Sequence, residues 1–267
     1  MLGDPDVLRA LELAHSDMSD PGLLLLAVAV FLFAGTVKGL VGLGMPTIGL
    51  GALTLASDLH TAMALVLFPS LASNLRQALR GGHGRAILAR LWPYLLAAVA
   101  LIPVGGLALT RVELGALSGL LGVLLVVYAG TALAGWRPIL ARRHEGWSAP
   151  LVGALNGVLT GMTGAFLVPS VIYLQAIQLP RDQLIQGMGI LFLAATVTLG
   201  LTLGGNRLLT PELAGLSALA ILPAFAGMRL GERLRAHLSE ARFRKVLLIA
   251  LLAAGAYIAL QALLSTL

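Results

Sequence analysis

Eight apolar segments, each long enough to cross a membrane, occupy most of the chain. They run roughly over residues 21–56, 59–79, 87–110, 113–134, 148–178, 184–203, 212–230 and 244–265. A helix of about 18 or more apolar residues covers the ~30 Å of bilayer hydrocarbon. Only 11% of the 267 residues are charged and 58% are hydrophobic, so the chain lacks the charged coat, near a quarter of residues, of a soluble domain. We therefore expect an all-α polytopic membrane protein.

Two of these segments, 21–56 and 148–178, differ from the others because they are long, rich in glycine and interrupted by proline. The 36 residues of the first would reach ~54 Å as one helix, nearly twice the hydrocarbon thickness. Each segment is therefore expected to form a hairpin of two helices broken at the glycines. With these hairpins the eight segments give up to ten helices.

The distribution of basic residues supports the hairpins. If every segment crosses once, the two sides of the membrane collect 9 and 8 basic loop residues; if the two long segments make no net crossing, the counts become 14 and 3. The first side then holds Arg76, Arg80, Arg85, Arg90, Arg137, Arg142, Arg143, Arg181, Arg229, Arg233, Arg235, Arg242, Arg244 and Lys245, and the second holds Arg9, Arg111 and Arg207. Cytoplasmic loops carry the excess of basic residues, so both termini are expected outside the cytoplasm.

The hairpin topology predicts two halves of opposite orientation. Each half would contain one hairpin and three crossings, an odd number, so the second half enters the membrane upside down, as in many secondary transporters. We expect a short extracytoplasmic segment at 1–20, a first repeat at 21–136, a cytoplasmic linker at 137–147 and a second repeat at 148–267. The acidic 1–20 segment is unlike a cleavable signal.

The glycines of the two long segments match in register. Gly35, Gly39 and Gly42 correspond to Gly157, Gly161 and Gly164 at a constant offset of 122, and Pro46 and Pro169 lie one residue out of that register. One explanation is close helix packing through small residues four apart. The other is a broken helix that lines a cavity, where free N–H groups at helix starts suit anions.

These motifs resemble the sulfite exporter TauE/SafE family, also called the TSUP family. The first copy reads GTVKGLVGLGMPTIGLG from Gly35, and the second reads GVLTGMTGAFLVPSVIYLQAIQLP from Gly157 to Pro180. The resemblance covers most of residues 22–265, although the first copy departs from the family's glycine triplet at Met45. It implies a secondary transporter in the bacterial inner membrane that exports small anions, sulfite or organosulfur anions of the sulfonate type.

Lys38 is the basic residue that lies well inside an apolar segment. A cation at that depth costs several kcal/mol unless it has a partner, which makes it a candidate functional residue. No acidic residue lies at mid-membrane depth in either half, so an anionic ligand would supply the counter-charge. The alternatives are that the side chain reaches the interface or binds a backbone carbonyl.

Polar residues near the second glycine run complete the candidate site. Thr160 precedes Gly161 as Lys38 precedes Gly39, and Asn156 and Thr163 lie nearby; bonding of the threonines to their own helix is the alternative. The predicted substrate-binding residues are Lys38, Gly39, Gly42, Gly44, Pro46, Asn74, Asn156, Thr160, Gly161, Thr163, Gly164 and Pro169. Asn74 belongs to a polar stripe with Ser70, Ser73 and Gln77, which interhelical hydrogen bonds would also explain. Arg76 and Arg80 are interpreted as interface anchors.

Several classes of function are excluded by missing residues. The chain has no cysteine, its five histidines are scattered, and it lacks a His-Glu-x-x-His motif and paired intramembrane aspartates. We therefore expect no thiol chemistry, metal, cofactor, nucleic-acid partner or enzymatic activity. The expected partners are the bilayer and a small anion, and a homodimer is compatible with the sequence. A drug/metabolite-type exporter with five-plus-five inverted helices and a non-anionic substrate is the alternative.

Overall fold

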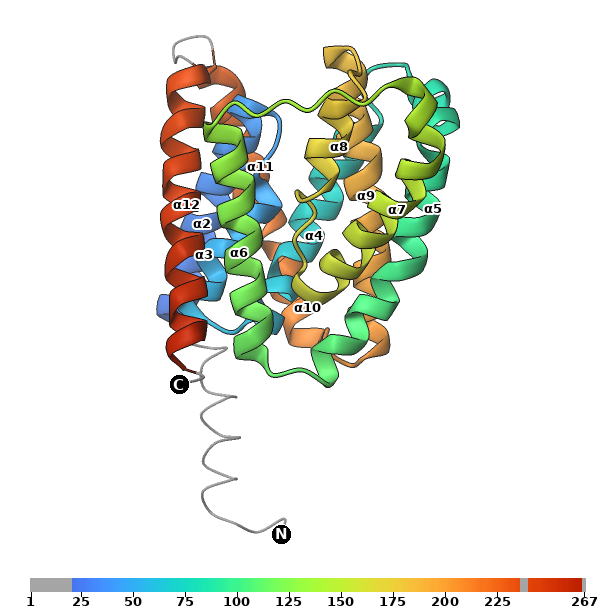
Figure 1. The fold of residues 1–267 in the computed structure, drawn as a ribbon. Helices are drawn as coiled ribbons and strands as arrows, with labels where there is room; N and C mark the ends of the chain where they lie inside the picture. The colour runs from blue at the N-terminus through green and yellow to red at the C-terminus, as the bar shows by residue number, and fades with distance from the viewer. Residues whose placement is uncertain (1–20, 236–239, 266–267) are drawn as a thin grey trace.

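The computed structural model describes residues 21–235 and 240–265, which form helices and the segments that connect them (Figure 1). The helices are α2 (Pro21–Val41), α3 (Met45–Ala56), α4 (Leu59–Ala78), α5 (Gly84–Gly106), the short 3-10 helix η2 (Leu107–Thr110), α6 (Leu114–Leu133), α7 (Arg142–Thr163), α8 (Ser170–Ala176), α9 (Arg181–Gly205), α10 (Pro211–Leu219), α11 (Ile221–Leu234) and α12 (Glu240–Leu264). The all-α class is confirmed for these residues. The N-terminal segment expected at 1–20 lies outside them.

Six stretches of the described residues are long and apolar enough to cross a membrane. They are Leu24–Val41, Gly84–Thr110, Leu114–Leu133, Arg181–Gly205, Pro211–Leu234 and Ala241–Leu264. Helices α4 and α7 have comparable lengths of 20 and 22 residues, which is about 30 Å each, but their sequences are more polar. The prediction of a multi-pass membrane protein is confirmed.

Both long segments are broken at the predicted glycines. Gly42 follows α2 with φ 84° and Gly164 follows α7 with φ 71°, a left-handed conformation that commonly ends helices at glycine. The N–H of Gly42 donates to the carbonyl of Lys38, and that of Gly164 to the carbonyl of Thr160, each over 2.8 Å. The short helices that follow, α3 with 12 residues and α8 with 7, are ~18 Å and ~10 Å long. Each segment thus joins a membrane-length helix to a return helix too short to cross.

The connections gather at two opposite ends of the bundle (Figure 1). The upper end in this view carries the break at 42–44 and the connections 79–83, 134–141 and 177–180. The lower end carries the start of α2, the end of α12 and the connections between α3 and α4, α5 and α6, and α9 and α10. The fourteen basic residues predicted to share one side lie in the connections of this upper end or in the parts of α4, α5, α7, α9, α11 and α12 that are nearest to it in the sequence.

Two helix boundaries differ from those expected. The apolar segment 212–230 divides into α10 and α11 at Ala220. Pro223 has no N–H to donate to the carbonyl four residues earlier, at Leu219, which explains the interruption. Helix α7 begins at Arg142, six residues before the apolar segment, because hydropathy does not register the polar first turns of a helix.

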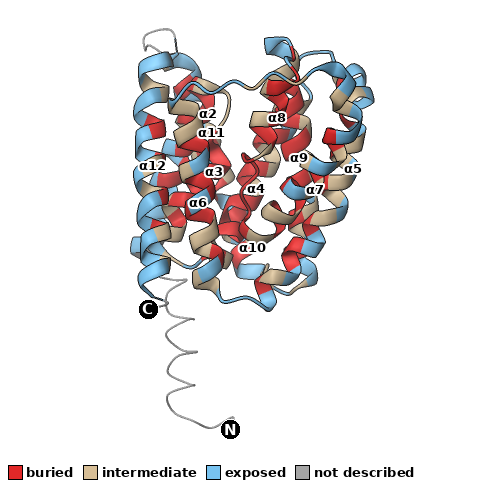
Figure 2. Cartoon of the chain, in the orientation of Figure 1, coloured by how far each residue is buried: buried red, intermediate tan, exposed pale blue. Residues whose placement is uncertain are grey.

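Helices of the first half pack on helices of the second. The main pairs are α2 with α11, α5 with α7, α6 with α12, and α4 with α9. Glycines permit the closest approaches: a Cβ atom at Gly35 would lie 2.1 Å from the carbonyl oxygen of Ala224, and one at Gly161 would lie 2.1 Å from that of Ile102. Close helix packing, one of the two explanations of the glycine runs, is therefore confirmed at Gly35 and Gly161. The same runs also contain the helix breaks at Gly42 and Gly164. Buried residues face the interior, and many exposed ones lie on the outer helix faces (Figure 2).

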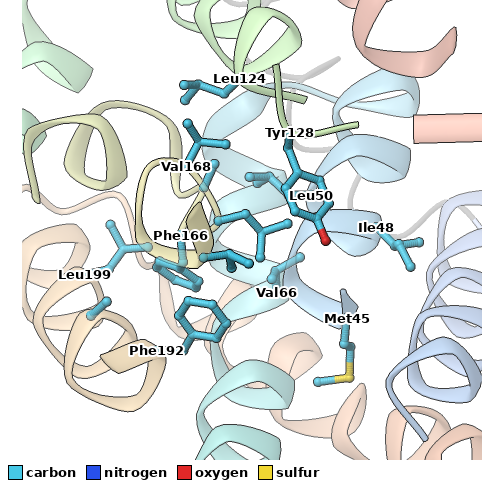
Figure 3. Close-up of a cluster of buried hydrophobic side chains, with 14 of the residues drawn as sticks. Met45, Ile48, Leu50, Val66, Leu124, Tyr128, Phe166, Val168, Phe192 and Leu199 are labelled. Carbon is cyan, nitrogen blue, oxygen red and sulfur yellow. The ribbon is translucent and has the colours of Figure 1, made fainter. Parts of the chain in front are cut away.

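An apolar cluster fills the centre of the bundle (Figure 3). Phe166, from the segment between α7 and α8, stacks on Phe192 of α9 with ring centroids 6.0 Å apart. Leu50 of α3 and Val66 of α4 are buried in the same cluster. The second helix break therefore contributes an aromatic side chain to the core.

Candidate functional site

Lys38 is buried, with 5% of its surface exposed. Its ammonium nitrogen donates to Oδ1 of Asn74 over 2.6 Å and to Oγ of Ser73 over 3.0 Å. Both acceptors lie on α4, so the contact joins the end of α2 to the polar stripe predicted on 59–79. The ammonium is therefore held by two side chains, one of them the predicted Asn74, and not by a backbone carbonyl.

The charge of Lys38 has no protein counter-charge nearby. Both acceptors are neutral, and among the described residues no carboxylate lies within 4 Å of its nitrogen. An ammonium has three N–H donors, so one remains after the bonds to Ser73 and Asn74. A buried cation without an opposite charge is costly, and an anionic ligand would lower that cost.

Lys38 lies at a cavity of about 150 Å³, the Lys38 vestibule, between α2, α4, α9 and α11. Its polar side chains are Lys38, Ser73, Arg76, Gln77, Arg80, Glu232 and Arg235. Gly39 and Gly42 line it as well; Gly39 packs against the backbone of α11, whereas no atom lies within 4 Å of a Cβ position at Gly42, so the backbone there is open to a ligand. The vestibule belongs to the upper, basic end of the bundle, where the side chain of Arg80 is 67% exposed.

An ion-pair cluster spans the vestibule. Arg76 of α4 contacts the carboxylate of Glu232 of α11 at 2.7 Å, and Arg80 lies 4.0 Å from the same oxygen. Arg76 and Arg80 are thus more than interface anchors, since they line the cavity that contains Lys38. The sequence interpretation missed them, although Ser73 and Arg76 lie three residues apart on one face of α4 and Arg80 follows two residues after the end of that helix.

A line of polar groups continues from Lys38 into the second half. Nδ2 of Asn74 donates to Oγ1 of Thr196 over 3.3 Å, and that hydroxyl donates to the carbonyl of Phe192 over 2.6 Å. Thr196 lines a small cavity of about 10 Å³ together with Ser70, Gly164 and Phe166. A cavity of this size holds about one water molecule. The polar line therefore ends at the apolar cluster of Figure 3.

The candidate residues of the second half lie apart from the vestibule. Thr160 donates to the carbonyl of Ala165 over 3.1 Å, and Thr163 donates to that of Leu159 over 2.7 Å. Thr163 therefore bonds to its own helix, as the alternative explanation expected, whereas Thr160 bonds to a carbonyl just after the end of α7. The structure places Gly161 against α5, and neither Gly164 nor Pro169 at the vestibule.

Asn156, also predicted at the site, is 3% exposed, and its Oδ1 has no hydrogen-bond partner among the described residues. Gly44 and Pro46 form the start of α3 and do not line the vestibule either. Of the twelve predicted residues, the structure therefore brings together Lys38, Gly39, Gly42 and Asn74. Over the described part of the chain, no three histidine or acidic side chains lie close enough to hold a metal ion.

Comparison with known proteins gives one match. The family model described as "Sulfite exporter TauE/SafE" matches residues 27–258, from α2 into α12. No curated protein and no solved structure matches the chain. The matched range includes both helix breaks and every residue of the Lys38 vestibule.

Proposed function

The chain belongs to the sulfite exporter TauE/SafE family, whose members are membrane transporters and not enzymes, and on that premise we propose that it exports small anions through the Lys38 vestibule. The substrates are sulfite or sulfonate-type anions. The protein acts as a secondary transporter, and Lys38 binds the transported anion.

The observation that carries this proposal is the buried ammonium of Lys38 with two neutral acceptors. An anion in the vestibule would accept the remaining N–H and provide the absent negative charge. Charge-assisted hydrogen bonds of this kind are about twice as strong as neutral ones. Arg76, Arg80 and Arg235 add guanidinium groups, whose planar donors match oxyanions in pairs.

Two inverted repeats would explain the helix pairing. The first helix of one half packs on the second of the three crossings of the other half in both cases, α2 on α11 and α7 on α5. Gly42 and Gly164, 122 residues apart, end α2 and α7 with equivalent bonds. Asn74 and Thr196 are also 122 residues apart and meet each other, as equivalent residues on a two-fold axis would.

Alternating access would then proceed by movement of one half against the other, because the vestibule lies between them. In the opposite state, we propose that the second break and its neighbours, Asn156, Thr160, Gly161, Thr163, Gly164 and Pro169, approach the anion. Phe166 stacks on Phe192 and lines the small cavity beside Thr196, and this apolar packing would close the path from the vestibule to the lower end. This arrangement fits a state in which the vestibule is open to the basic end. In this proposal Gly44 and Pro46, at the start of α3, hold the shape of the first helix break.

The basic end is proposed to face the cytoplasm of the bacterial inner membrane, with both termini outside. An inside-negative potential then favours anion exit by ~2.3 kcal/mol per charge per ~100 mV. Export would therefore need no carboxylate proton relay. A drug/metabolite-type exporter of non-anionic substrates would have ten even spans, whereas α3 and α8 have 12 and 7 residues.

The test is flux of radiolabelled sulfite in proteoliposomes under an imposed membrane potential. Wild type, Lys38→Ala and a control, Arg143→Ala, are compared; Arg143 is an exposed arginine at the same end of the bundle. We expect saturable, potential-driven flux in wild type and control, and its loss in Lys38→Ala. Flux that follows a pH gradient and ignores potential would reject potential-driven export, and wild-type flux in Lys38→Ala would remove Lys38 from the mechanism.

A further inference from the structure

A larger cavity in the described structure is separate from the Lys38 vestibule. It has a volume of about 910 Å³ and lies at the basic end, enclosed by the end of α6, the connection 134–141, the junction of α8 with α9, and the start of α12. It shares no residue with the vestibule. We call it the basic cavity.

The polar lining of the basic cavity is strongly positive. Arg137, Arg181, Arg244 and Lys245 line it from three separate parts of the chain, the connection, α9 and α12. Gln175 and Gln178 add amide groups, and no carboxylate is among its described lining residues. The converging basic groups can bind a ligand that carries negative charge on several oxygens.

The rest of the lining is apolar and lies where a membrane surface would be. Trp136 and Ile139, on the connection, are 55% and 74% exposed, and tryptophan concentrates at the headgroup level of bilayers. The cavity is also lined by Leu133 at the end of α6, Leu179 in the connection between α8 and α9, and Leu248 of α12. A ligand with an anionic head and an apolar body would satisfy both kinds of lining.

The size of the cavity also favours such a ligand. At about 910 Å³ it falls in the ~300–1,000 Å³ range of sites that hold large organic ligands, whereas the Lys38 vestibule has about 150 Å³. An inorganic anion of a few atoms would contact only part of the basic set. A phospholipid headgroup, with its glycerol and the first acyl carbons, would reach most of it.

We propose that the basic cavity binds the headgroup of an anionic phospholipid. Basic pockets between transmembrane helices on the cytoplasmic side are known to hold such headgroups. The phosphate would bind Arg244 and Lys245 of α12 together with Arg137 of the connection. Since the connection joins the two halves of the chain and is tied to α8 by the 2.8 Å bond from the N–H of Leu140 to the carbonyl of Ala176, the lipid would link α12 to the α8 region.

The test uses the full chain, purified in detergent and depleted of lipid. Thermal unfolding is measured with added phosphatidylglycerol or phosphatidylcholine, and bound lipids are counted by native mass spectrometry. The test variant is Arg244→Gln/Lys245→Gln. The matched control is Arg142→Gln/Arg143→Gln, which removes the same charge from exposed positions at the same end but outside the cavity.

We expect phosphatidylglycerol, relative to phosphatidylcholine, to raise the melting temperature of wild type and control by about 5 °C. The same lipid should raise that of the test variant by less than about 1 °C, with one fewer bound lipid. Three outcomes would overturn the proposal: no shift specific to phosphatidylglycerol in wild type, equal shifts in all three proteins, or an equal shift produced by inorganic phosphate alone in wild type and control but not in the test variant. The last would make the cavity a site for free anions.

Discussion

The side chains of Asn74 and Thr196, one from each half of the chain, meet in a hydrogen bond of 3.3 Å. Asn74 also accepts from Lys38 over 2.6 Å, so its amide connects the buried ammonium to the second half. A change in the relative position of the halves would therefore alter the surroundings of Lys38 directly.

This relationship predicts a difference between two substitutions of Asn74. Asn74→Asp places an ionisable carboxylate against the ammonium and neutralises it, whereas Asn74→Ala removes an acceptor but adds no charge. We expect the dissociation constant for sulfite to rise at least ~10-fold in Asn74→Asp, or ~1.4 kcal/mol, and less in Asn74→Ala. Equal affinities of the two variants, measured by titration calorimetry, would contradict the role of the charge.

The ion pair between Arg76 and Glu232 predicts that removal of the carboxylate strengthens sulfite binding, whereas Asn74→Asp weakens it. Glu232 contacts Arg76 at 2.7 Å and is partly exposed, so Glu232→Gln frees arginine donors and makes the cavity more positive. We expect the KM for sulfite flux to fall about two- to fivefold, in line with the modest energies of exposed charge pairs. The control is Glu145→Gln, which removes a carboxylate paired with Arg90 at the same end. An unchanged or higher KM in Glu232→Gln would contradict the account.

The packing of α2 on α11 predicts a stability effect at Gly35. A methyl group there would lie 2.1 Å from the carbonyl oxygen of Ala224, so Gly35→Ala must separate the two helices. Overpacking of this kind costs about 1–3 kcal/mol. Gly130→Ala is the control, because no atom lies within 4 Å of a Cβ atom at that position in α6. Thermal unfolding in detergent should show a lower melting temperature for Gly35→Ala alone; equal melting temperatures would argue against the close contact.

The orientation in the membrane can be tested with single cysteines, since the chain contains none. Arg111→Cys lies at the end with few basic residues, and Arg143→Cys lies at the basic end; both positions are exposed. A membrane-impermeant thiol reagent added to intact spheroplasts should label Arg111→Cys at once and Arg143→Cys only after permeabilisation. The reverse pattern would place the basic end outside and invert the proposed direction of transport.

Much of the fold could be predicted because its causes are local. Hydropathy gives the membrane helices, and Gly42 and Gly164 end α2 and α7 where the glycine runs predicted a break. The grouping of the basic residues at one end could also be predicted, because it depends only on which loops between the apolar segments contain them. The division at Ala220 was missed, although Pro223 was a local signal for it.

The site was only partly predictable because it depends on which helices meet. Lys38 stood out by its depth, and Asn74 by its polar stripe. Arg76, in contrast, looks in sequence like any interfacial arginine; its role depends on Glu232, 156 residues away on α11. Thr160 matches Lys38 in register, but its hydroxyl bonds to the carbonyl of Ala165 at the helix break. The matching register of the two glycine runs therefore did not give equivalent contacts.

The central claim is that the charge of Lys38 binds the transported anion. Equilibrium binding of radiolabelled sulfite to purified protein, under anaerobic conditions, tests it most directly with Lys38→Met, which keeps the side-chain length and removes the charge. The control is Arg143→Met. We predict that wild type and control bind sulfite saturably and that the dissociation constant of a folded Lys38→Met rises at least ~10-fold. Wild-type affinity in Lys38→Met would contradict the account.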